Sequence, residues 1–425
     1  MLIIKYPKKQ DWAQLLTRPT FDNSALTETV QSVLNDVKNR GDEAVKEYGI
    51  KFDKVQLSDL QVSEHEISEA EKLVSEELKS AILLAKNNIG KFHATQKYDL
   101  PKVETMPGVT CWQKAVAIEK VGLYIPGGTA PLFSTVLMLA IPAQIAGCKE
   151  IVLCSPPNRE GKIHPAVLYA AQVSGVTKIY KIGGIQAIGA MAYGTESVLK
   201  VYKIFGPGNQ YVTAAKQLVS LRDVAIDMPA GPSEVEVLAD KTANPAFVAA
   251  DLLSQAEHGV DSQSILITTN EELAQKVVEQ VAMQVEQLPR ADLAKEALEH
   301  SKIIIVKDMD EAIAMTNEYA PEHLIISTRN YHAIAEKIIN AGSIFLGHLT
   351  PESAGDYASG TNHTLPTNGY AKAYSGVNLD SFVKKITFQE LTEEGLRSIG
   401  DAIEVMAENE LLVAHRNAVK LRRLS

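Results

Sequence analysis

The segment Val121-Gly122-Leu123-Tyr124-Ile125-Pro126-Gly127-Gly128 joins a short apolar run to a proline and two glycines. Apolar runs of this length that end in Pro or Gly are typical of strands buried inside a parallel sheet. A longer apolar stretch follows from about Leu132 to Ala146, and its length favours a helix. The segment therefore predicts the first strand, turn and helix of an α/β fold.

The same alternation of strand and helix continues in two series. The first series predicts strands at residues 121–125, 150–154, 178–182 and 201–205. The second predicts strands at residues 235–238, 264–268, 303–306, 324–327 and 344–346. We therefore expect an α/β protein with two Rossmann-like but incomplete lobes, each with a parallel sheet. Small helical segments are expected near both ends, at residues 24–48, 64–91 and 392–424.

Length and composition narrow the class of protein. A chain of 425 residues is too long for one ordinary core, and 45% hydrophobic with 22% charged residues is usual for a globular protein. A net charge of -10 argues against a general nucleic-acid binder, which needs a basic surface. No apolar run reaches the ~18 residues of a membrane span, and the three cysteines form no CxxC pair. These features predict a cytoplasmic protein in a reducing compartment, with no membrane partner.

Glycine-rich turns follow three strands of the first series, at Pro126-Gly127-Gly128, Gly183-Gly184 and Gly206-Pro207-Gly208-Asn209. Each could bring the backbone close to a phosphate at a helix N-terminus. None has the full G-x-G-x-x-G pattern, so each turn taken alone is better interpreted as an ordinary tight turn between strand and helix. Three such turns in one sheet nevertheless favour a ligand.

A polar cluster stands at the end of an apolar helix in Ser254-Gln255-Ala256-Glu257-His258-Gly259. Asn244-Pro245 predicts the start of that helix, since Asn is a common cap and Pro a common first residue. Gln255 and His258 are three residues apart and would share one helix face. Buried polar groups need partners, so a metal ion or a polar substrate is expected there.

Two further groups of ionisable residues could carry chemistry. Glu322 and His323 directly precede a predicted strand, where a histidine could move protons and a glutamate could activate water. We expect them at the ligand-binding edge of an open α/β sheet. Asp356 and His363 lie in the irregular stretch 347–376 and are plausible ligands for a metal or a substrate. For both groups, a polar surface turn is the alternative.

Glu410 and His415 form a third group, in the terminal helical segment. On one ideal helix they would lie ~140° apart, so a bend or two separate targets would be required. Zinc accepts imidazole and carboxylate ligands, and Gln255, His258, Asp356 and His415 could supply such a set. Their spacing alone does not establish it, and an amide ligand is unusual for zinc.

Taken together, these segments resemble the histidinol dehydrogenase family over nearly the whole chain from about Ser24. Seven segments carry the resemblance: Tyr124 to Gly128, Ile204 to Asn209, Asp227 to Glu234, Leu253 to Gly259, Ala320 to Leu324, Gly355 to His363 and Glu408 to His415.

The resemblance implies oxidation of L-histidinol to L-histidine by two NAD⁺ through an aldehyde, in histidine biosynthesis. It implies Glu322 and His323 as the acid-base pair. The residues implied for zinc, which would also face the substrate, are Gln255, His258, Asp356 and His415. Further substrate contacts are implied for Ser233, His323, His363 and Glu410. Those implied for NAD⁺ are Tyr124, Gln186 and Asn209.

The family is a homodimer in which the C-terminal segment reaches the partner's site, so Glu410 and His415 are expected to act in the other subunit. We expect an N-terminal segment at 1–20 and a first lobe formed by 21–123 together with 235–377. The second lobe, 124–234, is expected to bind NAD⁺, and 378–425 to reach the partner subunit.

Four other functions fit part of the sequence. An aldehyde dehydrogenase that uses a thiol would need a nucleophilic cysteine, but Cys148 and Cys154 lie in apolar contexts. A zinc hydrolase could use Glu322 on water but would not need NAD⁺. A two-lobed binding protein without catalysis would not need the Glu-His pair. A dehydrogenase of another amino or hydroxy alcohol is the most serious alternative.

Overall fold

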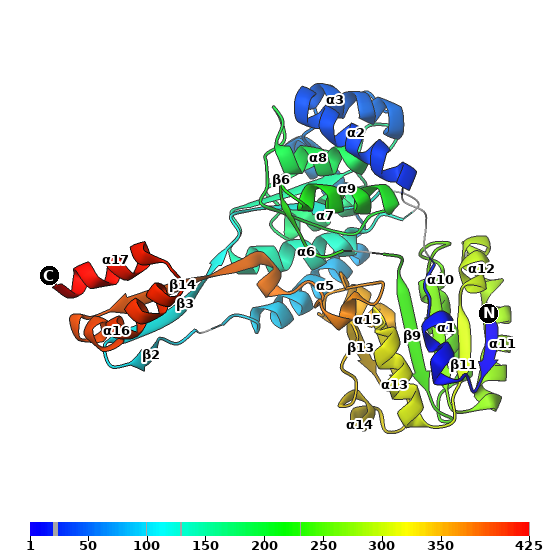
Figure 1. Cartoon of the computed structure of the whole chain (residues 1–425). Coiled ribbons are helices and arrows are strands. Elements are labelled where there is room, and N and C mark those ends of the chain that lie inside the picture. The colour runs from blue at the N-terminus through cyan, green and yellow to red at the C-terminus, as the bar shows by residue number, and fades with distance from the viewer. Residues whose placement is uncertain (20–23, 99, 128–129, 230, 425) are drawn as a thin grey trace.

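A computed structural model describes residues 1–19, 24–98, 100–127, 130–229 and 231–424. Figure 1 shows two α/β lobes and an arm that projects away from both. Gly128 and Ala230, which belong to two of the sequence segments above, lie outside the described residues. Among the described helices, none is long and apolar enough to cross a membrane.

The upper lobe in Figure 1 is built on a five-stranded parallel sheet in the order β6-β5-β4-β7-β8. Its strands are β4 (Lys120–Tyr124), β5 (Glu150–Ser155), β6 (Lys178–Lys181), β7 (Lys203–Phe205) and β8 (Ala225–Ile226). The helices between them are α6 (Phe133–Ala146), α7 (Pro165–Val173), α8 (Gly184–Tyr193) and α9 (Gln210–Ser220). The helix α6 is apolar on nearly every side, as expected for a helix that is buried all round.

The lower lobe is built on a six-stranded sheet in the order β1-β11-β10-β9-β12-β13, and every neighbouring pair is parallel. Its strands are β1 (Leu2–Lys5), β9 (Glu234–Ala239), β10 (Gln263–Thr268), β11 (Lys302–Ile305), β12 (His323–Ser327) and β13 (Ser343–Leu346). The helices are α1 (Trp12–Leu15), α10 (Pro245–Ala256), α11 (Glu271–Val285), α12 (Ala291–Glu299), α13 (Met309–Tyr319), α14 (Tyr331–Ala335) and α15 (Glu352–Tyr357). All nine predicted strands are therefore present, and the predicted α/β class is confirmed.

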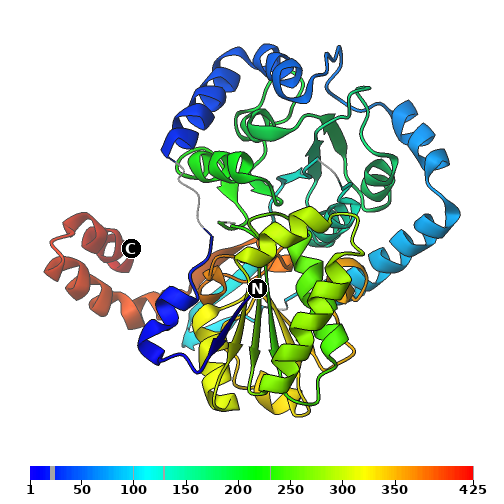
Figure 2. The same ribbon diagram turned by 90° about the vertical axis from the view of Figure 1, so that its right-hand side faces the viewer.

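The arm consists of an antiparallel ribbon followed by two helices (Figures 1 and 2). The strand β14 (Val383–Leu391) pairs along its whole length with β3 (Val109–Ala117), and β2 (Val103–Met106) adds a third strand. The helices α16 (Glu393–Asn409) and α17 (Val413–Leu424) follow. The terminal helices were predicted, but the ribbon was not.

The N-terminal helices cover the upper lobe, which differs from the expected grouping of 21–123 with 235–377. Residues of α2 (Ser24–Arg40) and α3 (Asp42–Tyr48) share a core with Tyr124 and α8. Residues of α4 (Glu64–Leu73) and α5 (Glu76–Ala94) share a core with α6 and α7. Burial of their apolar faces against these helices explains the placement. The expected separate segment 1–20 instead supplies β1 and α1 to the lower lobe.

Candidate active site and cofactor cavity

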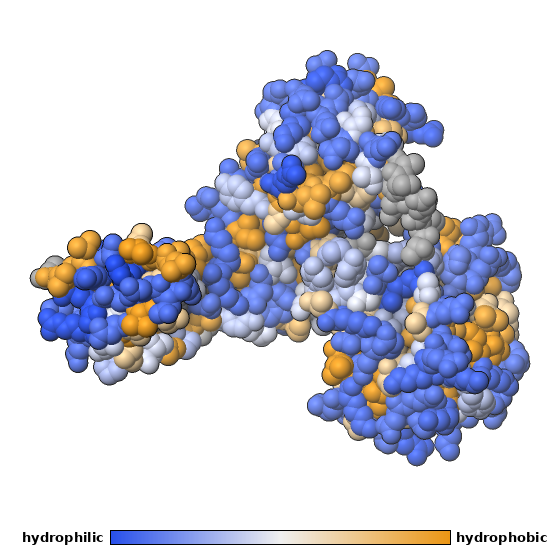
Figure 3. Space-filling model, in the orientation of Figure 1, coloured by the Kyte–Doolittle hydropathy of each residue, from blue (hydrophilic) through white to orange (hydrophobic). Residues whose placement is uncertain are grey.

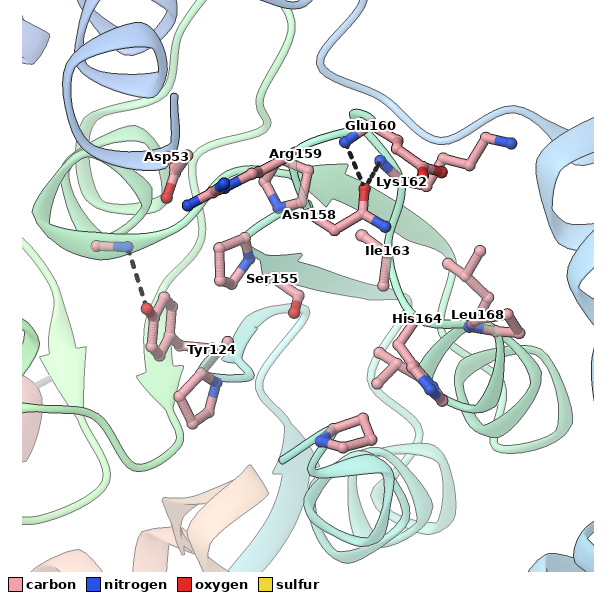
Figure 4. A pocket seen from close by; sticks show the side chains of 18 of the residues that line it. Asp53, Tyr124, Ser155, Asn158, Arg159, Glu160, Lys162, Ile163, His164 and Leu168 are labelled. Carbon is pink, nitrogen blue, oxygen red and sulfur yellow. Dashed lines mark hydrogen bonds between the residues drawn. The ribbon is translucent and has the colours of Figure 1, made fainter. Parts of the chain in front are cut away.

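A cavity of about 1440 Å³ opens at the carboxyl ends of β4 and β5 in the upper lobe. Tyr124, Gln186 and Asn209, the three residues expected at the cofactor, all line it. Figure 4 shows Tyr124 and Ser155 at the strand ends, with the loop that carries Asn158 to His164 around them. The carboxyl edge of a parallel sheet is where open α/β folds bind ligands. The structure therefore brings these three residues together, as expected.

Each of the three residues is fixed by its local structure. Tyr124 ends β4, and its buried hydroxyl accepts a hydrogen bond of 3.0 Å from the N–H of Gly184. Asn209 caps α9, because its side-chain oxygen accepts from the N–H groups of Tyr211 and Val212 at 3.1 Å each. Gln186 is 1% exposed and its Oε1 has no hydrogen-bond partner. An unpartnered buried acceptor beside a cavity points to a ligand with a donor group.

The turn Gly206-Pro207-Gly208-Asn209 is held by a buried ion pair. Lys216 Nζ lies 2.6 Å from Asp227 Oδ1 and donates to the carbonyl of Gly206 at 2.7 Å, while Asp227 Oδ2 accepts from the N–H of Gly206 at 2.9 Å. Gly206 has φ +119°, and a Cβ there would lie 2.1 Å from the carbonyl oxygen of Tyr124. Only glycine therefore fits this turn.

A second polar region lies in the lower lobe, at the amino ends of its strands and not at their carboxyl ends. His323 is the first residue of β12 and pairs in register with Val235 of β9. The sequence correctly predicts that Glu322 and His323 stand at the start of a strand, although the strand begins at His323 and not after it. It wrongly suggests the usual ligand-binding edge, which is the carboxyl edge. The helix α10 runs back from the carboxyl edge and brings Gln255 to the same amino edge.

His323 is buried and surrounded by carboxylates. Its Nδ1 lies 3.0 Å from the carbonyl oxygen of Glu234, which can only accept, so Nδ1 carries the proton. Its Nε2 has no hydrogen-bond partner. Burial alone would lower the pKa of His323, but the charges of Glu352, Glu322 and Asp356 outweigh it and hold that pKa well above its usual range. An imidazole with one fixed nitrogen and one free nitrogen is suited to move a proton.

Glu322 lies beside this imidazole, with Oε2 3.7 Å from His323 Nδ1. The same oxygen accepts from the N–H of Glu234 at 2.9 Å. Burial raises the pKa of Glu322 to about 8. A carboxyl group whose pKa is raised toward neutrality can accept and return a proton in that range.

The structure gathers three metal-donor side chains, of which His258 and Asp356 belong to the set expected from the sequence and Glu352 does not. His258, Glu352 and Asp356 each offer a ligand atom, and these atoms lie within 4.8 Å of one another. Gln255 joins them: both ends of its amide are satisfied when the nitrogen donates to Glu352 Oε1 at 2.5 Å and the oxygen accepts from the N–H of Glu234 at 3.3 Å. Imidazole and carboxylate donors at this separation fit a divalent metal.

Glu352 was missed by the sequence analysis, although it is 1% exposed. Its Oε1 lies 3.6 Å from His323 Nδ1, and burial raises its pKa. The available signal was its spacing of four residues from Asp356, which places both carboxylates on one face of α15. Arg18 was also missed; it forms two hydrogen bonds to Glu234, of 2.6 and 2.8 Å, and no sequence pattern indicated it.

His258 lies just beyond α10, which ends at Ala256, and not on the helix face expected from the sequence. Its N–H donates to the carbonyl of Gln255 at 3.2 Å, so one tight turn keeps the two side chains close. The ring is exposed, but the surrounding protein atoms still lower the pKa of its imidazole.

Asp356 and His363 also join this region. Asp356 Oδ1 lies 3.7 Å from His323 Nε2; burial opposes ionisation of Asp356, but the nearby imidazolium of His323 outweighs it and lowers that pKa. His363 Nδ1 lies 3.0 Å from the carbonyl of Asp356, and its Nε2 lies 3.1 Å from the hydroxyl of Thr135 at the start of α6. Ser233 directly precedes β9 and its Glu234. The polar region therefore connects to the upper lobe through α6.

Glu410 and His415 are not part of this cluster within one chain. Both are exposed on the arm, which Figures 1 and 2 show away from the lower lobe. Leu411 between them has φ +61° and separates α16 from α17. This break supplies the bend that their spacing required.

Comparison with known proteins identifies the family. A family model described as histidinol dehydrogenase matches residues 16–423. A histidinol dehydrogenase from Bacteroides thetaiotaomicron is 70% identical over 422 residues, 99% of each chain. One from Escherichia coli is 55% identical over 412 residues, 96% of this chain and 94% of the relative.

Solved structures agree. The crystal structure of histidinol dehydrogenase from Elizabethkingia anophelis matches with a TM-score of 0.97 and 57% identity, over 99% of this chain and 98% of that one. An acetylating aldehyde dehydrogenase from Geobacillus thermoglucosidasius shares only the fold, with a TM-score of 0.50, 17% identity and coverage of 89% and 94%. The chain, which matches the family model and its relatives almost from end to end, belongs to the histidinol dehydrogenase family.

Proposed function

We propose that this protein oxidises L-histidinol to L-histidine in two NAD⁺-dependent steps, through L-histidinaldehyde, as the last steps of histidine biosynthesis. In the first step the alcohol and NAD⁺ give the aldehyde, NADH and H⁺. In the second, the aldehyde, water and a second NAD⁺ give the carboxylate, NADH and two H⁺. The observation that carries the proposal is the cluster of Glu322 and His323 beside a metal-donor set and linked through α6 to a large cavity.

His323 is the base for the alcohol proton. Its Nδ1 is held by the carbonyl of Glu234, so Nε2 is the nitrogen that would take the alcohol proton, and the surrounding carboxylates would stabilise the imidazolium that results. Glu322, beside it, suits the second step, in which the aldehyde must add water before a second hydride can leave. Its raised pKa favours proton exchange near neutral pH.

Gln255, His258 and Asp356 would hold a divalent metal, with His415 of a second subunit completing the set. The fit rests on the donor atoms of His258, Glu352 and Asp356, which already lie within 4.8 Å of one another. We take the metal to be Zn²⁺, one per subunit, which would fix the position of the substrate nitrogens when bound. Ser233, His363 and, from the partner, Glu410 would contact the same substrate.

Tyr124, Gln186 and Asn209 would bind NAD⁺, the hydride acceptor, in the upper-lobe cavity. The cavity of about 1440 Å³ is large enough for a dinucleotide. The thiol route receives no support, since burial raises the pKa of Cys148 to about 12 and that of Cys154 further. The free cysteines agree with a cytoplasmic location.

The active unit would be a homodimer in which each arm serves the other subunit. The arm exposes large apolar side chains, as the orange surface over α16 and α17 in Figure 3 shows. These include Val405, Met406, Leu411, Leu421 and Leu424. Exposed apolar surface of this extent is typical of an interface between chains.

The central experiment measures NADH and histidine formed from L-histidinol, before and after removal of the metal with a chelator. We expect about two NADH per histidine, as the two balanced steps above require, and loss of activity on chelation that Zn²⁺ restores. A panel of other amino alcohols is the control for substrate identity. No NADH from L-histidinol would refute the proposal.

Glu322→Gln separates the two steps. The variant should slow the oxidation of supplied L-histidinaldehyde more than the oxidation of L-histidinol, because only the second step consumes water. Equal losses in both steps would remove Glu322 from the role of water activation.

Shared sites can be tested with mixed subunits. His323→Ala and His415→Ala homodimers should both be inactive, whereas heterodimers of the two should regain activity at one of their two sites. Purified heterodimers without any recovery would show that the arm does not serve the partner.

A further inference from the structure

We infer that Asp53 selects NAD⁺ over NADP⁺, by accepting hydrogen bonds from the adenosine ribose in the upper-lobe cavity. Asp53 ends the short helical turn η2 (Gly49–Asp53) and lines this cavity. The inference rests on the proposed use of a dinucleotide and adds the residue that decides which one is used.

The cavity is lined by two groups of elements besides the end of β4. One group consists of η2 and the starts of α8 and α9, and it contributes Asp53, Gln186 and Asn209. The other consists of α4 and α7, and it contributes residues such as Glu69 and Leu168. The residues expected at the cofactor belong to the first group or, like Tyr124, to the end of β4, so we place the dinucleotide there.

The direction of the dinucleotide follows from the active cluster. Ala130 and Pro131 line the cavity and lead into α6, where Thr135 contacts His363. The nicotinamide must reach that side, since the hydride leaves from a substrate held near His323. η2 contacts α3 through the stacking of Phe52 on Tyr48, and α8 through the hydrogen bond between Gln186 and Asp53, so we place the adenosine half on that side.

Asp53 is available to accept hydrogen bonds. Among the described residues, no Lys or Arg side chain forms an ion pair with it, and its one hydrogen bond, from Gln186 Nε2, is long at 3.4 Å. Figure 4 shows the carboxyl group of Asp53 above the bond between Tyr124 and Gly184. Burial raises the pKa of Asp53 to about 6, as expected for a carboxylate that lacks partners.

The carboxylate of Asp53 matches a ribose diol. It offers two acceptor oxygens at the cavity wall, and its one hydrogen bond within the described residues is long. The 2′- and 3′-hydroxyl groups of a ribose are donors, and one carboxylate can accept from both. A 2′-phosphate has no such donor when ionised and would place two negative groups side by side. An acidic residue at the ribose is the usual device for NAD⁺ selection in dinucleotide sites.

Phe52 adds a surface for the base. It lines the cavity beside Asp53, is 46% exposed, and stacks on Tyr48 with ring centroids 5.6 Å apart. A fixed, exposed aromatic face fits the adenine ring.

Arg159 makes the selection testable, because it also lines this cavity. Figure 4 shows its exposed side chain extending toward Asp53. An arginine near the ribose is the usual receptor for a 2′-phosphate. Asp53 therefore disfavours the 2′-phosphate of NADP⁺, which Arg159 could otherwise bind.

The experiment compares wild type, Asp53→Asn, Arg159→Ala and the double variant. For each we would measure kcat/KM with NAD⁺ and NADP⁺, and titrate each dinucleotide calorimetrically without substrate. Asp53→Asn should weaken NAD⁺ roughly tenfold, since a charged hydrogen bond is lost. It should strengthen NADP⁺ by a similar factor through Arg159, and the double variant should lose this gain.

Glu69→Gln is the matched control, since it removes a carboxylate contributed to the cavity by α4 and not by η2. It should leave the NAD⁺ to NADP⁺ ratio unchanged. An unchanged ratio in Asp53→Asn, or an equal change in Glu69→Gln, would overturn the inference. The calorimetric titrations decide it separately from turnover, so failure to oxidise L-histidinol would refute only the proposed function.

Discussion

The two candidate functional regions lie at opposite edges of their sheets and are built from different chemical groups. In the upper lobe, the cavity lies at the carboxyl ends of β4 and β5 and is shaped largely by turns and helix starts. In the lower lobe, the cluster lies at the amino ends of β9 and β12 and consists of buried ionisable side chains. The cavity is shaped by backbone turns, whereas the lower-lobe cluster gathers ionisable side chains.

This difference separates the two tasks of the protein. A cavity made of turns can be complete within one chain, because its geometry depends on local backbone. The cluster around His323 instead brings several buried ionisable groups together, and their mutual influence shifts the pKa values of Glu322, His323 and Asp356. The proposed metal and the partner's arm would complete the lower-lobe cluster, whereas the residues that line the cavity all come from one chain. Substitutions should accordingly affect chemistry in one region and cofactor binding or folding in the other.

The largest effect is expected from His323→Asn. The asparagine amide can still donate to the carbonyl of Glu234, but it cannot take a proton, so kcat with L-histidinol should fall roughly 10³-fold. The affinity for NAD⁺ should not change, because the cavity is untouched. Exposed His332→Asn is the control and should keep full activity. A loss of NAD⁺ affinity in His323→Asn would show that the two regions are not separate.

Lys216→Met should damage the cavity without touching the cluster. It leaves Asp227 buried and unpaired below the turn at Gly206, which should lower the free energy of unfolding by about 3 kcal/mol and weaken NAD⁺ binding. Urea denaturation and calorimetric titration measure the two effects. The exposed pair Lys276–Glu272 gives the control: Lys276→Met should cost less than about 0.5 kcal/mol. A similar loss of unfolding free energy in both variants would contradict a stabilising role for the buried pair of Lys216 and Asp227.

Glu352→Gln tests the residue that joins Gln255 to the cluster. Removing its charge should weaken metal binding about 10- to 100-fold, because the carboxylate orients the Gln255 amide and adds negative charge to the donor set. Competition with a chromogenic chelator measures this affinity. Glu299→Gln, on the exposed surface, should bind metal as the wild type does. Unchanged affinity in Glu352→Gln would limit Glu352 to packing.

The smallest effect concerns the pH dependence of stability. Burial raises the pKa of Asp53 to about 6 in the fold, so the folded state holds this proton more tightly than the unfolded state. Wild type should therefore lose stability relative to Asp53→Asn as the pH rises from about 4 to 6, with a constant difference above that range. Because Asp53 is partly exposed, this loss in the free energy of unfolding of the wild type should not exceed about 1 kcal/mol. Melting temperatures without cofactor at pH 4.5, 6 and 8 measure it, and no difference at pH 8 would contradict it.

Much of the fold could be predicted because its signals are local. The nine predicted strands are apolar runs bounded by turns, and the cap at Asn244-Pro245 marks the start of α10 as expected. The partners of β1 and β14 could not be predicted, because each pairs with a strand hundreds of residues away. The grouping of α2 to α5 with the upper lobe depends on which apolar faces pack together. Hydrophobic periodicity predicts that a helix has an apolar face but not which element will cover it.

The candidate site was predicted in part for similar reasons. Gln255, His258, Glu322, His323, Asp356 and His363 meet in one region, but only the family resemblance joined these distant segments. The edge of the sheet on which they meet was wrong, because strand direction relative to the site is a property of topology. No sequence pattern pointed to Asp53 as a ligand-binding residue, since η2 lies outside the two series of strands and helices.

The ribbon of the arm has a consequence for how the protein is made. β3 is synthesised long before its neighbour β14, and the two pair along their full length. The upper lobe, from α2 to β8, is nearly contiguous in the chain and can fold while later segments are still being synthesised. The ribbon of the arm must wait until β14 has been synthesised. A truncated chain would therefore carry a formed cavity but no arm, and could not complete the catalytic unit proposed for the dimer.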